Sequence, residues 1–200
     1  MNDIDDDFHD DLEWEKEPTE EDAARQDEIL LRRQRHFRAA AERVAVVWGE
    51  IAAVEKIVLF GAAAARLWRE IPRFRAYQRA RIVLWHECRD VDLAVWVSDL
   101  GCLADLRKAV GRALRYLLAE KGIGIAHHQV DAFIMEPGSD RHLGALCHFN
   151  ECPKGKSECL VAGCGTPPFL RQHEGFALAA EVAQPDRYPV LYERRADRDA

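Results

Sequence analysis

Two aspartates, Asp90 and Asp92, stand at the head of the apolar run Val91–Val97, which is rich in β-branched residues. Such a run predicts a buried β-strand. Because side chains alternate between the two faces of a strand, both carboxylates are expected on one face, with Val91 and Leu93 on the other. Two neighbouring buried carboxylates destabilise a fold by several kcal/mol unless a cation neutralises them. The strand is therefore expected to begin at a cation-binding site.

A third acid, Asp131, lies in the apolar run Ile125–Met135, whose alternation also predicts a strand. If the two strands are neighbours, Asp90, Asp92 and Asp131 converge. Three carboxylates suit one or two Mg²⁺ ions that complete their coordination with water and phosphate oxygens. The alternative is that Asp90 caps its strand and Asp131 pairs with a nearby arginine.

The flanking segments predict alternating strands and helices. Ile57–Phe60 is a short apolar run that stops at Gly61, and the alanine-rich stretch 62–70 predicts a helix ended by Pro72. A further helix is expected from Ser98 or Asp99 to Gly122, with its leucines and valines on one face. Residues 19–54 form a long amphipathic helix in this interpretation, opened by the capping-box sequence Thr19-Glu-Glu-Asp22.

Phe60-Gly61 after a strand, then Asp90-Val-Asp92-Leu, then Val130-Asp131, resembles the minimal nucleotidyltransferases of the DNA polymerase beta superfamily. The resemblance spans residues 56–135, and the core is placed at 55–135. It implies that the three acids hold two Mg²⁺ ions and that Asp131 assists deprotonation of the acceptor. It also implies that the Gly61–Ala62 turn holds the triphosphate through backbone amides. The family's Gly-Ser turn is Gly-Ala here, so a hydroxyl contact to phosphate is missing.

The stretch between the turn and Asp90 is basic and contains aromatic residues. Six arginines fall within sixteen residues, and Glu70 is the only acid among them. The arginines are Arg66, Arg69, Arg73, Arg75, Arg79 and Arg81. Arg66 is expected to contact the nucleotide, and the group as a whole suits a triphosphate tail or an RNA backbone. The alternative is an ordinary solvated surface with its aromatic side chains in the core.

Four cysteines follow in the segment 136–183, which is dense in turn residues. Cys147, Cys152, Cys159 and Cys164 have the spacing Cys-x4-Cys-x6-Cys-x4-Cys. Four thiolates complete a tetrahedral Zn²⁺, and such a structural site would organise a long loop that has little core of its own. His148 or His173 is an alternative ligand for one cysteine. An iron–sulfur cluster and plain reduced thiols remain the other interpretations.

The charge of the chain is distributed unevenly. Twelve acids and one base fall within residues 1–22, whereas the chain as a whole has a net charge of −7. Residues 1–18 are therefore expected to be a disordered acidic tail, and residues 184–200 a frayed C-terminal tail. The sequence starts without a secretory signal and contains no apolar run of membrane-spanning length, so a cytoplasmic protein is expected. In such a compartment cysteines remain reduced or bind metal.

These observations together predict an α/β (α+β) fold in which a small mixed sheet with helices follows a long helix and precedes a cysteine-rich module. The expected activity is Mg²⁺-dependent transfer of a nucleoside monophosphate from a nucleoside triphosphate to a hydroxyl. The acceptor is left open between a protein side chain, an RNA end and a small hydroxylated compound. The main alternative is a catalytically degenerate nucleotide- or RNA-binding module whose zinc site contacts a partner. A weaker one is the antitoxin-like half of a two-protein system.

Overall fold

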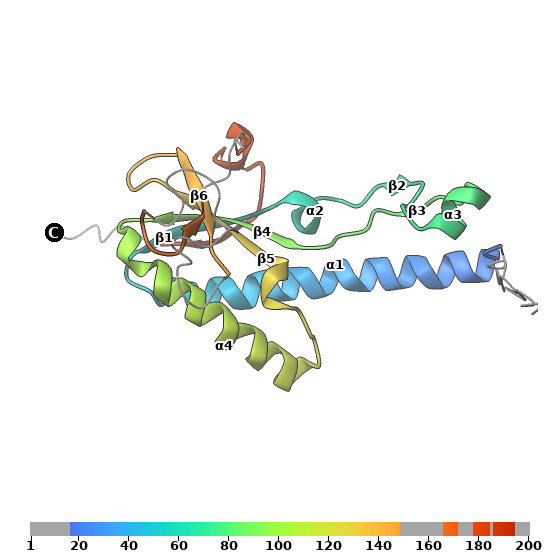
Figure 1. The fold of residues 1–200 in the computed structure, drawn as a ribbon, viewed down its shortest axis with the longest axis horizontal. Helices are drawn as coiled ribbons and strands as arrows, with labels where there is room; N and C mark the ends of the chain where they lie inside the picture. The colour runs from blue at the N-terminus through green and yellow to red at the C-terminus, as the bar shows by residue number, and fades with distance from the viewer. Residues whose placement is uncertain (1–16, 149–165, 172–177, 185, 195–200) are drawn as a thin grey trace, which may run out of the picture.

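The computed structural model describes residues 17–148, 166–171, 178–184 and 186–194, and shows a mixed α+β fold with a six-stranded sheet (Figure 1). The strand order is β7-β6-β5-β4-β1-β8. The strands are β1 (Val54–Phe60), β4 (Val91–Val97), β5 (Val130–Met135), β6 (His142–Leu146), β7 (Leu170–Arg171) and β8 (Val190–Glu193). Only β4 and β5 are parallel, and every other neighbouring pair is antiparallel.

Two long helices, α1 (Glu20–Gly49) and α4 (Leu103–Lys121), cover one face of this sheet (Figure 1). Their apolar residues pack with the inward side chains of the strands into the main core. The fully buried Trp48 ties the two helices together, because its indole Nε1 donates a hydrogen bond of 2.8 Å to the Leu106 carbonyl. Burial of a hydrogen-bonded tryptophan combines a large apolar area with a satisfied polar group.

The helix ends follow the local sequence signals. Thr19 caps α1 in a capping box with Asp22, as the sequence predicts. Asp99 accepts a hydrogen bond from the Gly101 amide and opens a 3₁₀ turn, η1 (Leu100–Cys102), that leads into α4. Gly122 ends α4 in the left-handed conformation, which glycine adopts without steric cost.

An extended arm lies beyond the sheet, alongside the N-terminal half of α1 (Figure 1). It consists of β2 (Arg69–Glu70), α3 (Arg75–Ala80) and β3 (Leu84–Trp85), and β2 pairs with β3. Asp27 of α1 holds the arm, because its carboxylate contacts Arg69 at 2.8 Å and accepts a hydrogen bond of 2.8 Å from the Trp85 amide.

The helix predicted over residues 62–70 is wrong. The helix there, α2, covers only Gly61–Ala64, and Arg69 already belongs to a strand. Side chains from α1 explain the early end, because Gln34 donates hydrogen bonds to the Ala62 and Ala65 carbonyls, at 3.0 and 2.8 Å. Arg38 likewise donates to the Ala63 carbonyl at 2.7 Å. These contacts satisfy the carbonyls that a longer helix would have used.

Segments that the sequence places outside the core contribute strands to the sheet. β6 and β7, both from the predicted cysteine-rich segment, extend it beyond β5. β8, from the predicted C-terminal tail, pairs with β1 on the other side. Arg194 follows β8 and donates hydrogen bonds of 3.0 Å to the carbonyls of Ile51 and Val54, at the turn between α1 and β1.

The remaining short elements are 3₁₀ turns. One of them, η2 (His127–Gln129), occupies the first part of the run predicted as a strand over residues 125–135. The other, η3 (Ala180–Val182), places Val182 against the second face of the sheet, beside Val58 and Trp96. No helix in the described ranges combines the length and the apolar character needed to cross a membrane.

We predict that Gln34→Ala lowers the free energy of unfolding by about 1–3 kcal/mol, because the Ala62 carbonyl loses its donor and the Ala65 carbonyl keeps only the hydrogen bond from Arg38. Urea unfolding followed by circular dichroism measures the change. Gln26→Ala, on the same helix, is the matched control and is expected to change stability by less than about 0.5 kcal/mol. Equal stabilities for the two variants would contradict the role assigned to Gln34.

Candidate functional site

Asp92 and Asp131 are directly paired neighbours on the two parallel strands. The register places Asp92 opposite Asp131, and Phe60 of β1 opposite Asp92 on the other side. Adjacent strands lie about 4.8 Å apart, so the two carboxyl groups project from neighbouring positions. They share the sheet face of Ala94, Trp96 and Met135, which is the face opposite to the main helices.

Asp90 directly precedes β4, on the chain leading into the same point. Burial raises the pKa of the Asp90 carboxyl, and the negative charge of Asp131 raises it further. Burial likewise raises the pKa of Asp92 to about 7, with further contributions from the charges of Asp90 and Asp131. The structure therefore brings the three predicted acids into one electrostatically coupled group.

Gly61 adjoins this group through its backbone. Its φ angle of +67° lies in the left-handed region, and a methyl group added to its Cα would overlap the Asp92 carboxylate. Glycine is therefore required here for two independent reasons, backbone conformation and space. Ala62 is half-buried in α2, and Arg66 is exposed immediately beyond that helix.

A histidine that sequence reasoning did not assign to the acid group also reaches it. His148 Nε2 lies 3.3 Å from Asp131 Oδ1, although His148 was considered only as an alternative zinc ligand. His127 packs edge-on against His148, with ring centroids 5.2 Å apart. Burial lowers the pKa of His127, and the charge of His148 lowers it further.

The donors gathered at this point are carboxylate oxygens, the ligand type that Mg²⁺ prefers. Among the described residues, neither Asp90 nor Asp92 forms an ion pair, so no direct partner neutralises these half-buried carboxylates. As placed, no three Asp, Glu, His or Cys side chains in the described part of the chain form a group that could hold a metal ion. Mg²⁺, however, is commonly bound by one or two carboxylates together with water and substrate phosphates.

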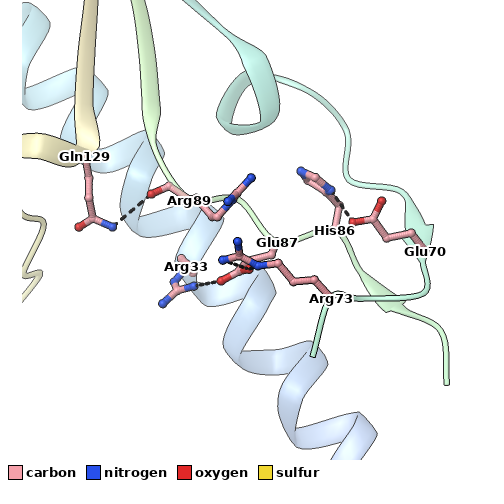
Figure 2. Close-up of polar contacts among 7 residues, drawn as sticks. All are labelled: Arg33, Glu70, Arg73, His86, Glu87, Arg89 and Gln129. Atoms are coloured by element: carbon pink, nitrogen blue, oxygen red, sulfur yellow. Dashed lines mark hydrogen bonds and ion pairs between the residues drawn. The ribbon is translucent and has the colours of Figure 1, made fainter. Parts of the chain in front are cut away.

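Next to Asp90, residues of the arm and of the segment that leads from β3 into β4 line a small cavity of about 210 Å³. Figure 2 shows the polar contacts around it. Glu87 binds two arginines there, Arg33 of α1 at 2.5 Å and Arg73 at 3.0 Å. His86 contacts Glu70 at 2.8 Å, and this hydrogen bond lowers the pKa of Glu70. The positive charge of Arg89 lowers the pKa of Asp90, which offsets part of the effect of burial. The cavity is therefore an ion-paired pocket at the edge of the acid group.

The ion pairs that these arginines form change the interpretation of the basic stretch between the Gly61 turn and Asp90. Arg69 is paired with Asp27, and Arg73 shares Glu87 with Arg33, so part of the positive charge of the stretch is compensated within the chain. Trp68 stacks on His86 with ring centroids 3.9 Å apart, and 45% of its surface is exposed. The stretch thus serves in part to attach the arm to α1.

The predicted zinc site lies mostly outside the described residues. Cys147 is buried at the end of β6, whereas Cys152, Cys159, Cys164 and His173 are not among the described residues. The two other described cysteines are buried thiols, as expected for Cys88. Burial raises the pKa of Cys88 to about 12 and that of Cys102 to about 11, so neither is a reactive thiolate.

Comparison with known proteins found no matching family model, no matching curated protein and no matching solved structure.

The residues that support the acid group were not evident in the sequence. Gln34 and Arg38 lie on the long helix with no local motif around them, and His148 is separated from Asp131 by a strand and a turn. A weak signal existed for Gln34, which is a polar residue within the apolar stripe of α1.

We predict that Asp92→Asn stabilises the metal-free protein at about pH 8 by on the order of 2 kcal/mol. The pKa of Asp92 is raised from 3.8 to about 7, so ionisation of this carboxyl opposes folding. The penalty is absent below about pH 4, grows as the pH rises from about 4 to about 7, and is constant at higher pH. Urea unfolding in EDTA at several pH values measures it.

Asp105→Asn is the matched control, because Asp105 is exposed on the first turn of α4. It is expected to lose rather than gain a few tenths of a kcal/mol, through the helix dipole. A gain at Asp92 that does not depend on pH would contradict the electrostatic explanation.

We predict one equivalent of zinc in the purified chain, released by strong chelators, if the four-cysteine spacing binds metal. Metal analysis by mass spectrometry measures the content. Cys159→Ser is expected to lose the metal, whereas Cys102→Ser, which removes a buried thiol outside the motif, is expected to retain it. If the purified wild-type protein is colourless and contains no metal, the zinc prediction is wrong and the four cysteines are reduced thiols.

Proposed function

We propose that this chain is a Mg²⁺-dependent nucleotidyltransferase, which transfers a nucleoside monophosphate from a nucleoside triphosphate to an acceptor hydroxyl. The observation that carries the proposal is the direct pairing of Asp92 with Asp131, with Asp90 beside them and the Gly61 backbone against the Asp92 carboxylate. A chain has little reason to hold three mutually repelling acids together unless a cation or a proton transfer makes use of them.

The topology around the acids supports the proposal. β1 ends at the Gly61 turn and runs antiparallel to β4, which carries Asp92, and β4 is parallel to β5, which carries Asp131. This order of strand, glycine turn, Asp-x-Asp strand, helix and third-acid strand is the pattern on which the resemblance to minimal nucleotidyltransferases rests.

Asp90 and Asp92 are the residues that would hold the metal, with Asp131 completing the set. Mg²⁺ bound there would neutralise the carboxylates and withdraw charge from the phosphate oxygens during transfer. The Gly61–Ala62 backbone amides would face the triphosphate, and the exposed Arg66 would add a positive charge beside it. Gln34 and Arg38 would keep this turn in place through their bonds to the α2 carbonyls.

The reaction forms one bond and breaks one. The acceptor oxygen bonds to the α-phosphorus, the bond between that phosphorus and the oxygen bridging to the β-phosphate breaks, and pyrophosphate leaves. Asp131 receives the hydroxyl proton, and His148, 3.3 Å from Asp131, orients its carboxylate. The chain's contribution is therefore to position the reactants and to hold the transferred proton.

A second candidate is a nucleotide- or RNA-binding module without catalysis. The observation that favours it is Ala62, because the side chain after the glycine offers no hydroxyl to phosphate. In that case the cysteine-rich segment would serve a partner interaction. The antitoxin-like role is not supported by any contact among the described residues.

The test is incubation of the metal-replete protein with each of the four α-³²P-labelled nucleoside triphosphates, Mg²⁺ and a cell extract. We predict that label moves from the triphosphate to an acceptor with the wild type, and that Asp92→Asn lowers the rate by at least about a hundredfold. Gel electrophoresis and thin-layer chromatography detect macromolecular and small acceptors, respectively.

Two controls make the result specific to the site. Asp105→Asn, an exposed carboxylate on α4, is expected to keep the wild-type rate. In thermal unfolding, Mg²⁺ with a triphosphate is expected to raise the Tm of the wild type but not that of Asp92→Asn. Triphosphate binding without any label transfer would favour the binding module, and equal rates for wild type and Asp92→Asn would overturn the catalytic proposal.

A further inference from the structure

A second, larger hollow lies along α4, on the side of that helix next to η2 and the end of β6. It measures about 640 Å³ and is lined by residues of these three regions. The lining residues are Arg107, Lys108, Gly111, Arg112, Arg115, His127 and His148. We refer to it as the α4 groove.

The α4 groove is strongly positive. All four of its helical side chains other than Gly111 are cationic, and α4 has no acid between Asp105 and Glu120. Within the described ranges, Lys108, Arg112 and Arg115 form no ion pair, in contrast to the paired arginines of the arm. Their charges are therefore available to an anionic ligand, as expected of a phosphate-binding surface.

Gly111 contributes to the hollow shape. A glycine inside a helix destabilises it by about 1 kcal/mol relative to alanine. Steric exclusion does not explain the glycine, because an added Cβ would meet only Arg115 Nη1, at 3.5 Å. The missing side chain leaves open space between the cations on either side.

The groove leads to the acid group. His148 lines the groove and also contacts Asp131 at 3.3 Å, while His127 packs against His148. A molecule bound along the groove would thus reach His148, which contacts Asp131, the residue that receives the acceptor's proton in the proposed reaction.

We propose that the α4 groove binds the phosphodiester backbone of a single-stranded nucleic acid whose terminal hydroxyl is the acceptor. This inference rests on the proposed function and names its acceptor class. Lys108 and Arg115 are seven residues apart, about 10 Å along the helix, so the cations address more than one phosphate. Transfer then lengthens the strand by one nucleotide and releases pyrophosphate.

Binding is tested without Mg²⁺ or triphosphate, so that it is measured independently of transfer. The affinity of the full chain for a fluorescent single-stranded RNA is measured by anisotropy over a series of KCl concentrations. The double variant Arg112→Glu/Arg115→Glu is expected to bind at least about tenfold more weakly. The plot of log affinity against log salt concentration is expected to become shallower, its negative slope decreasing in magnitude by about 1.4 for two lost phosphate contacts.

Arg32→Glu/Arg35→Glu is the matched control, because it makes the same charge change on exposed residues of α1. It is expected to retain most of the affinity. Circular dichroism checks that both double variants are folded. Equal loss in the two variants would mean nonspecific attraction to net charge and would overturn the assignment of the groove.

A competition experiment separates a strand from a small phosphorylated molecule. A nucleoside monophosphate added at the same phosphate concentration is expected to leave the RNA bound, and displacement would overturn the strand proposal. The labelled-triphosphate assay is then repeated with the RNA as acceptor. RNA binding that depends on Arg112 and Arg115 supports the groove, whereas absence of transfer with such binding intact contradicts the proposed function alone.

Discussion

The parallel pairing of β4 with β5 is the contact on which the candidate site depends. It sets Asp92 opposite Asp131 and leaves both on the face of the sheet away from α1 and α4. A shift of register by one residue would turn one of the acids toward the apolar core. The buried valines and leucines that alternate with the acids prevent such a shift, so the hydrophobic core that stabilises the fold also fixes the geometry of its most unfavourable charges.

The long helix α1 connects the parts of the molecule that the sheet does not hold. Trp48 anchors its C-terminal half to α4, Gln34 and Arg38 fix the Gly61 turn, and Asp27 attaches the arm. One helix thereby sets the positions of the turn and of the pocket beside Asp90. Lys108, Arg112 and Arg115 of α4 form no ion pair with any residue that the structure describes, which distinguishes a surface available to a ligand from one already used for structure.

Elements with strong local signals could be predicted from the sequence. Val91–Val97 has the predicted strand bounds, and the capping residues Thr19, Asp99 and Gly122 act where the pattern places them. Strand periodicity placed the acids on one face of each strand, but their convergence depended on β4 and β5 being neighbours, which the structure supplies. The helix prediction over residues 62–70 failed because side chains of α1, which are distant in the chain, override the helix propensity of alanine there. β6 and β8 were missed because their short, weakly apolar segments are strands only through pairing with β5 and β1.

The position of β8 has a consequence for how the protein is made. β1, the strand that leads into the Gly61 turn, has β4 on one side and β8 on the other. Arg194 then fastens β8 to the turn between α1 and β1. During synthesis this edge of β1 therefore remains unpaired until residues 190–193 have left the ribosome, long after β1 itself. The nascent chain must carry that exposed strand edge while β4, β5, β6 and β7 are being made.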